Sequence, residues 1–183
     1  MILFKKKLIL SRLIKDSVVF ILTDDSIFPT REALLEQDNY TKKELDDIDM
    51  HSRILALSYL YIVVMNYAKD HKFEGRYDEL KIGSIFGQSV LDANREVGGQ
   101  AFENSYVLQN LDKYNVRIVK MRESDPNHDD YFHAFEVFED MALGKREANK
   151  RPVSLITLGK FIRDEVVGKL MSGFIKNHRI YVD

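Results

Sequence analysis

Residues 54–68 read ILALSYLYIVVMNYA and form the longest stretch of the chain without a charged side chain. A helix drawn through them is apolar on nearly every side, so it belongs at the centre of a bundle, where neighbours cover it from several directions. Its fifteen residues are fewer than the ~20 that a membrane-spanning helix needs. The sequence therefore predicts a mainly α protein, a helical bundle around this central segment with a few short strands.

The beginning of the central helix is marked by Thr41 and Glu44, which have the T-x-x-E spacing of a capping box. From there the helix is expected to continue to about Lys72 and to stop at Gly75. The β-branched run at 62–64 leaves a buried strand as the alternative for its second half. The most buried side chains are expected to include those of Leu57, Leu60, Tyr61 and Val64.

Apolar residues spaced three or four positions apart predict three further helices. They cover about residues 77–97, 131–142 and 154–176. Within the first, Gly83 and Gly87 lie four positions apart, a spacing that would let another backbone approach closely.

Three short segments are rich in β-branched residues and are strand candidates. The strongest is 116–121, VRIVKM, and the others are 18–22 and 180–182. If they pair, the chain has an α+β fold with a small sheet, which is the alternative to the bundle. Because the chain has 183 residues and no repeat or long linker, we expect one domain over residues 1–183.

Composition excludes several classes of protein. An apolar fraction of 45% excludes a disordered chain. The absence of cysteine excludes disulfide scaffolds, thiol nucleophiles and cysteine-held metal clusters. The first apolar run is broken by three lysines at 5–7 and is followed by no small-residue cleavage site, unlike a secretory signal. We expect a soluble, cytoplasmic protein with no membrane contact.

The net charge of −2 is unevenly distributed. Residues 1–15 carry five cations and no acid, and residues 144–183 carry nine cations and four acids. Residues 16–143 carry thirteen cations and twenty-five acids. Either the basic ends fold back on the acidic middle, or they form a basic surface for an anionic partner.

A second basic cluster, four cations in seven residues, lies in a predicted connector at 144–152, before the last helix. It is solvated in the simplest interpretation, and in the alternative it contacts an anion or a partner. The candidate contact residues are Lys145, Arg146, Lys150 and Arg151.

Two carboxylate–histidine pairs have helical i, i+4 spacing: Asp47 with His51, and Asp129 with His133. On facing helices, four such side chains could hold a divalent metal. Each pair is also explained by the preference for acids near helix N-termini. We therefore expect no metal or other cofactor, and these residues carry only an alternative hypothesis.

Arg122 and His128 have the R-x5-H spacing that resembles the motif of helical HEPN-type ribonucleases, whose motif lies at a helix start. Here Pro126 and its polar neighbours indicate a turn between the two residues. No phosphate-binding loop, G-x-S-x-G or H-E-x-x-H pattern occurs.

These observations favour a non-catalytic subunit for protein interaction, regulation or assembly, with a protein partner or with itself. One alternative is a small metal-dependent hydrolase or nuclease that uses the Asp–His pairs. A second alternative, not favoured, is nucleic-acid binding through phosphate contacts with the basic ends.

Overall fold

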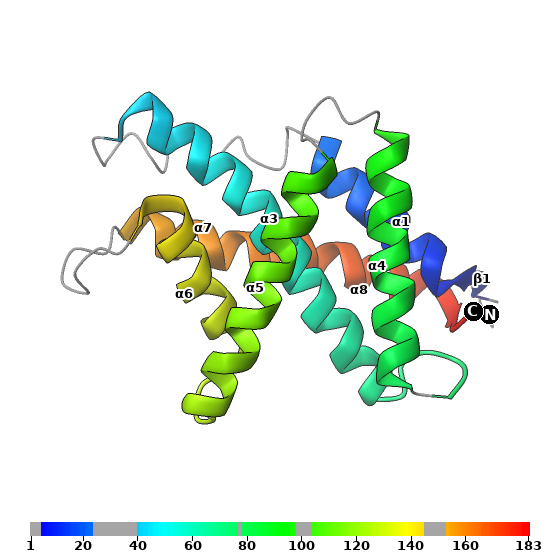
Figure 1. Ribbon diagram of the computed structural model, residues 1–183. Helices are drawn as coiled ribbons and strands as arrows, with labels where there is room; N and C mark the ends of the chain where they lie inside the picture. The colour runs from blue at the N-terminus through cyan, green and yellow to red at the C-terminus, as the bar shows by residue number, and fades with distance from the viewer. Residues whose placement is uncertain (1–4, 24–39, 77, 98–103, 145–152) are drawn as a thin grey trace.

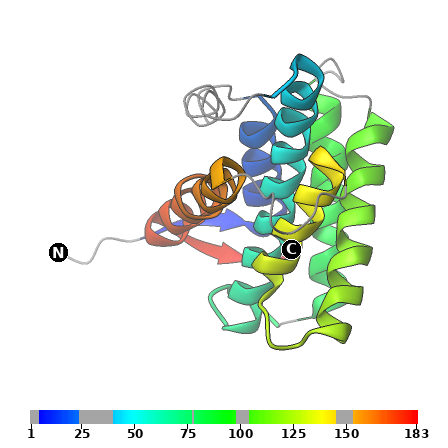
Figure 2. The same cartoon turned by 90° about the vertical axis from the view of Figure 1, so that its left-hand side faces the viewer.

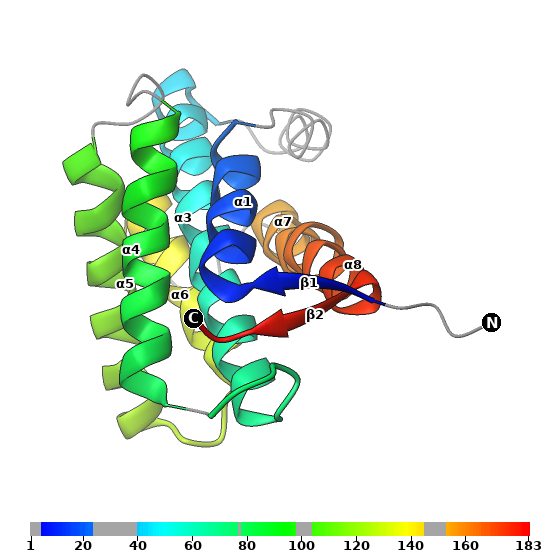
Figure 3. The same ribbon diagram turned by 90° about the vertical axis from the view of Figure 1, so that its right-hand side faces the viewer.

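The computed structural model describes residues 5–23, 40–76, 78–97, 104–144 and 153–183 (Figure 1). The elements are β1 (Lys6–Ile9), α1 (Leu10–Thr23), α3 (Lys42–Lys69), α4 (Glu79–Glu96), α5 (Asn104–Ser124), α6 (Asp130–Leu143), α7 (Val153–Phe161), the π-helical segment η3 (Ile162–Gly168), α8 (Lys169–Asn177) and β2 (His178–Tyr181). Figures 2 and 3 show three layers: α4 with α5, then α1, α3 and α6, then the helix formed by α7, η3 and α8. The predicted mainly α fold with a few short strands is confirmed.

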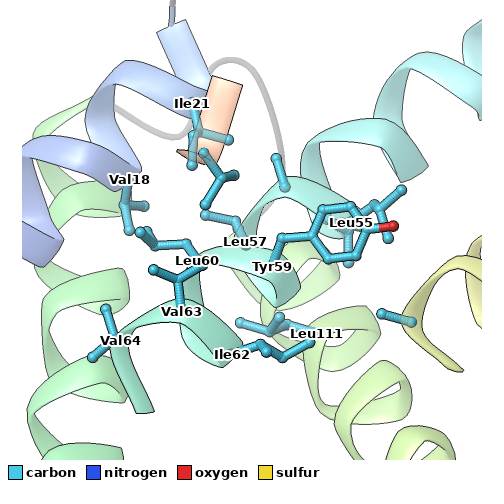
Figure 4. Packing of buried hydrophobic residues seen from close by; sticks show 14 of the residues in the cluster. Val18, Ile21, Leu55, Leu57, Tyr59, Leu60, Ile62, Val63, Val64 and Leu111 are labelled. Atoms are coloured by element: carbon cyan, nitrogen blue, oxygen red, sulfur yellow. The ribbon is translucent and has the colours of Figure 1, made fainter. Parts of the chain in front are cut away.

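The central position of α3 is confirmed by burial. Leu57, Leu60 and Val64 are fully buried, and Figure 4 shows their side chains among those of α1 and α5. The prediction for Tyr61 is wrong, because its ring is only partly buried and packs edge-on against Phe86 of α4, 5.0 Å between centroids. In the part of the chain that the structure describes, α3 is the one helix long and apolar enough to cross a bilayer, and 78% of its apolar window is buried inside the protein.

Both ends of α3 are set by local hydrogen bonds. The predicted capping box is present, since the Glu44 N–H donates to the Thr41 hydroxyl (3.2 Å) and the Thr41 N–H donates to the Glu44 carboxylate (2.8 Å). The helix ends at Lys69, earlier than expected, because His71 takes a left-handed conformation with φ of 56°. Gly75 lies beyond the helix and has a φ of 124°, which favours glycine.

Two of the three strand predictions are wrong. Residues 18–22 lie in α1, and residues 116–121 lie in α5. In α1 the buried side chains recur at helical spacing from Leu10 to Leu22, so packing one helical stripe overrides a short β-branched run. In α5, Ile118 is buried while Val116 and Val119 are each 46% exposed, so the alternation seen in the sequence is not a buried strand face.

The third strand candidate, 180–182, overlaps β2, which pairs in parallel with β1. β1 was not predicted. Glu74 adds a parallel bridge to Tyr181 on the other side of β2. Beyond the strand, the Asp183 carboxylate accepts a hydrogen bond from the Ser11 N–H (3.0 Å) and so caps the first turn of α1. β2 and Asp183 thereby lie beside β1 and the first turn of α1.

The last predicted helix, 154–176, is present as α7, η3 and α8 in succession. It lies against α6 at Gly159, where a Cβ atom would stand 2.4 Å from the ring of Phe135. No such approach occurs at the two glycines of α4. A Cβ at Gly87 would meet nothing within 4 Å, and one at Gly83 would meet only the Tyr61 hydroxyl at 3.9 Å. The close helix approach predicted there is wrong.

A buried arginine of α3 caps the C-terminal end of α1. Arg53 of α3 is 7% exposed and donates to the carbonyls of Ile21 (3.1 Å) and Leu22 (2.8 Å). These carbonyls belong to the last turn of α1, where the helix leaves its acceptors without partners and where the helix dipole favours a positive charge. Arg53 therefore fixes α1 against the central helix.

Candidate functional site

The strands β1 and β2 form a short ribbon with one face turned outward. In the parallel register Lys7 pairs with Arg179 and Ile9 pairs with Tyr181, so these four side chains share a face. Ile9 is 41% exposed, whereas Ile180, which points to the opposite face, is 2% exposed. The face that carries Lys7 and Arg179 is therefore the outer one.

Cations from both ends of the chain gather at this ribbon. The strands of such a sheet lie ~4.8 Å apart, so paired side chains are close neighbours. We call the exposed cations on and beside β1 and β2 the basic ribbon. It consists of Lys5, Lys6, Lys7, Lys176 and Arg179.

Most of these cations are available for an outside ligand. Lys5 donates to the carbonyl of Ile175 (2.7 Å) at the end of α8, and the Lys7 ammonium lies 4.6 Å from the centroid of the Tyr181 ring. Among the residues that the structure describes, the other ribbon cations have no ion pair. Glu74, next to Tyr181, is the acid that borders the outer face within the described ribbon.

The chemistry of this face is that of binding. Ammonium and guanidinium groups donate hydrogen bonds to carboxylates or phosphates. The Tyr181 ring holds the Lys7 ammonium in place through a cation–π contact. The face therefore offers groups that can recognise an anion.

The four cations of the predicted connector, Lys145, Arg146, Lys150 and Arg151, lie outside the described residues. Their proposed anion contact stays a prediction. The sequence did place cations at both ends of the chain, and the structure shows that part of each set meets at the basic ribbon.

The first Asp–His pair lies where α3 contacts α5. His51 is 4% exposed, and its Nδ1 lies 3.2 Å from the hydroxyl of Tyr114, whose ring stacks on the imidazole. Burial lowers the pKa of His51, and the charge of Asp47 only partly opposes that shift. His51 is thus a buried core side chain bonded to a tyrosine.

The second pair lies at the beginning of α6. Asp129 is the N-cap, and its carboxylate accepts from the Phe132 N–H (2.8 Å). His133 is 1% exposed, and its Nε2 lies 3.1 Å from the carbonyl of Asp125. Within the described part of the chain, no three His, Asp or Glu side chains are grouped so that they could hold a metal ion. The metal-dependent alternative therefore has no assembled site there.

Arg122 and His128 are both engaged at the turn between α5 and α6. The Arg122 guanidinium forms a bidentate salt bridge with the Asp130 carboxylate. The His128 Nδ1 lies 2.7 Å from the Asp125 carboxylate, and this hydrogen bond holds the pKa of Asp125 below its usual value despite partial desolvation. These contacts close a helical hairpin, a structural role for the R-x5-H spacing.

Comparison of the chain with models of known protein families, with curated proteins and with solved structures finds no match. The candidate site therefore rests on the geometry and charge of the ribbon.

Proposed function

We propose that this protein is a non-catalytic interaction subunit that holds an acidic region of a partner protein on the basic ribbon. One observation carries the proposal: Lys7 and Arg179, from opposite ends of the sequence, are paired across β1 and β2 on one outward face, with further exposed cations beside them. A fold that only neutralised its basic ends would pair them with the acidic middle of the chain. Lys15 does so with Glu96, but the described ribbon cations do not.

The charge of the rest of the molecule favours a protein over a nucleic acid. The chain as a whole carries a net charge of −2, so the surface outside the basic ribbon is more acidic still and repels an extended polyanion. A four-residue strand spans only ~13 Å, which matches a short acidic segment. Dedicated nucleic-acid binders are usually strongly basic. We also propose that the protein acts in the cytoplasm, because a chain without cysteine has no disulfides and so does not need an oxidising compartment.

The proposal is tested with two anionic probes and two charge-reversed variants. The probes are a labelled oligoglutamate and a labelled DNA duplex, titrated at low and at moderate salt by fluorescence anisotropy. The ribbon variant is Lys6→Glu/Lys7→Glu/Arg179→Glu. The control is Lys42→Glu/Lys43→Glu/Lys120→Glu, which reverses three exposed cations away from the ribbon.

We expect wild type and the control to bind oligoglutamate more tightly than DNA. Because each exposed charge contact contributes up to ~1 kcal/mol, the ribbon variant should bind oligoglutamate at least about tenfold more weakly. Its melting temperature should stay close to that of wild type. Equal loss in both variants, or tighter binding of DNA that the ribbon variant abolishes, would show that the proposed partner class is wrong.

A further inference from the structure

The direction of the β2 backbone follows from its two hydrogen bonds to Glu74. The Glu74 N–H donates to the Ile180 carbonyl (2.6 Å), and the Val182 N–H donates to the Glu74 carbonyl (3.0 Å). Ile180 and Val182 therefore turn their backbone groups away from β1. Because successive strand residues alternate, Arg179 and Tyr181 turn theirs toward β1.

The same alternation leaves one edge of β1 open. In the parallel register of Lys7 with Arg179, Arg179 bonds the residues on either side of Lys7, which are Lys6 and Leu8. The N–H and C=O of Lys7 and the N–H of Ile9 consequently point away from β2. Among the described residues, no other backbone group forms a hydrogen bond with these three groups.

Unpaired backbone groups along an exposed strand are a template for another strand. Here they lie on a residue with an exposed lysine side chain and on Ile9, which is 41% exposed. We propose that the acidic partner segment binds in an extended conformation and adds to the sheet as a strand beside β1. This inference rests on the proposed function and specifies how its ligand is held.

Charge decides which strand is accepted. The N-terminal strand region carries Lys5, Lys6 and Lys7 in succession, and like charges on directly opposed strand residues are destabilising. A second copy of β1 would bring three more lysines to the same edge and is disfavoured. A strand that carries glutamate or aspartate gains both the backbone ladder and the charge contacts.

Two peptides with the same number of glutamates separate strand addition from attraction of charge alone. In the first, glutamate alternates with valine; in the second, glutamate alternates with proline. Proline has no N–H to donate to a ladder, whereas the charge is unchanged. We expect the valine peptide to bind wild type about tenfold more tightly than the proline peptide, because every second residue of the proline peptide lacks an N–H and its fixed φ disfavours the extended ladder.

A matched pair of variants tests the protein side of the ladder. Ile9→Pro removes an outward N–H and keeps every cation, and it places proline just before α1, where Leu8 is already extended and helices accept proline. Ile9→Val keeps the N–H. We expect the preference for the valine peptide to persist in Ile9→Val and to fall severalfold in Ile9→Pro.

Amide hydrogen exchange of the wild-type protein gives a readout that needs no variant. The amides of Lys7 and Ile9 should exchange more slowly when the valine peptide is bound, while those of Lys6 and Leu8 are protected in both states. If both peptides bind equally and the amides of Lys7 and Ile9 stay unprotected, strand addition is wrong, whereas the proposal of an acidic partner is retained. If neither peptide binds, the proposed function itself is wrong.

Discussion

The packing of α7 on α6 depends on the missing side chain of Gly159. A Cβ atom at this position would lie 2.4 Å and 2.5 Å from two ring carbons of Phe135, against ~3.5–4.0 Å for a favourable carbon contact. The ring is itself packed against Phe138, 5.8 Å between centroids. Overpacking of this kind costs about 1–3 kcal/mol, whereas replacing a helical glycine by alanine gains at most about 1 kcal/mol.

Because the added Cβ would overlap the Phe135 ring by roughly 1 Å or more, the destabilisation should lie near the upper end of that range. We expect Gly159→Ala to lower the free energy of unfolding by about 2 kcal/mol net, measured by urea titration. For a chain of this length the melting temperature should fall by about 4–8 °C. Gly87→Ala is the matched control, because a Cβ there meets nothing within 4 Å, and it should stabilise the protein by up to about 1 kcal/mol.

A double-mutant cycle isolates the contact. In a Phe135→Ala background the ring is gone, so Gly159→Ala should no longer destabilise and should gain about 0.5–1 kcal/mol from helix propensity. The sign of the Gly159→Ala effect therefore reverses between the two backgrounds. Equal destabilisation in both, or stabilisation in the wild-type background, would refute the close approach of α7 to α6.

Four further measurements test the core, the contact at the end of α1, the partly buried phenol of Tyr131 and the histidines. Leu60→Ala should lower the free energy of unfolding by about 2–5 kcal/mol in urea titration, because removing the fully buried side chain leaves a cavity. A loss below about 1 kcal/mol would contradict the central position of Leu60. Arg53→Met should cost about 2–4 kcal/mol in the same assay, since two carbonyls lose a charged donor. Burial raises the pKa of Tyr131 to about 12, so the free energy of unfolding should fall as pH rises from about 10, the pKa of an unfolded tyrosine, through 12. Chemical denaturation at each pH measures this fall, and Tyr131→Phe should make it shallower. Calorimetric titration with zinc, manganese and magnesium should show no stoichiometric uptake, and a tight isotherm that His51→Ala/His133→Ala abolishes would overturn this.

The candidate site was only partly accessible to sequence reasoning. The excess of cations at the two ends was visible in the charge distribution, but their meeting was not, because β1 is four residues long and its partner lies at the other end of the chain. The Asp–His spacing supports a metal site only as an alternative hypothesis. The structure instead holds His51 against Tyr114 and His133 against a backbone carbonyl, since i, i+4 spacing fixes a helix face but not what packs against it.

The sequence by itself determined the features whose cause is local. The capping box at Thr41 and Glu44, the uniformly apolar run at 54–68, and the helical stripes of α4, α6 and the last helix are set by residues within one or two turns of each other. Neighbouring residues suffice to form the hydrogen bonds and to align the apolar faces, so these elements follow from the order of the amino acids.

Only the tertiary structure decided the rest. Residues 18–22 and 116–121 have β-branched composition, yet they are helical because each extends a stripe that the bundle buries, and strand propensity of at most about 1 kcal/mol is weaker than that burial. Conversely, Lys6–Ile9 becomes a strand because His178–Tyr181 lies beside it. A parallel ladder gains stability only when both strands are already in place, and that condition is met by the packing of helices between them.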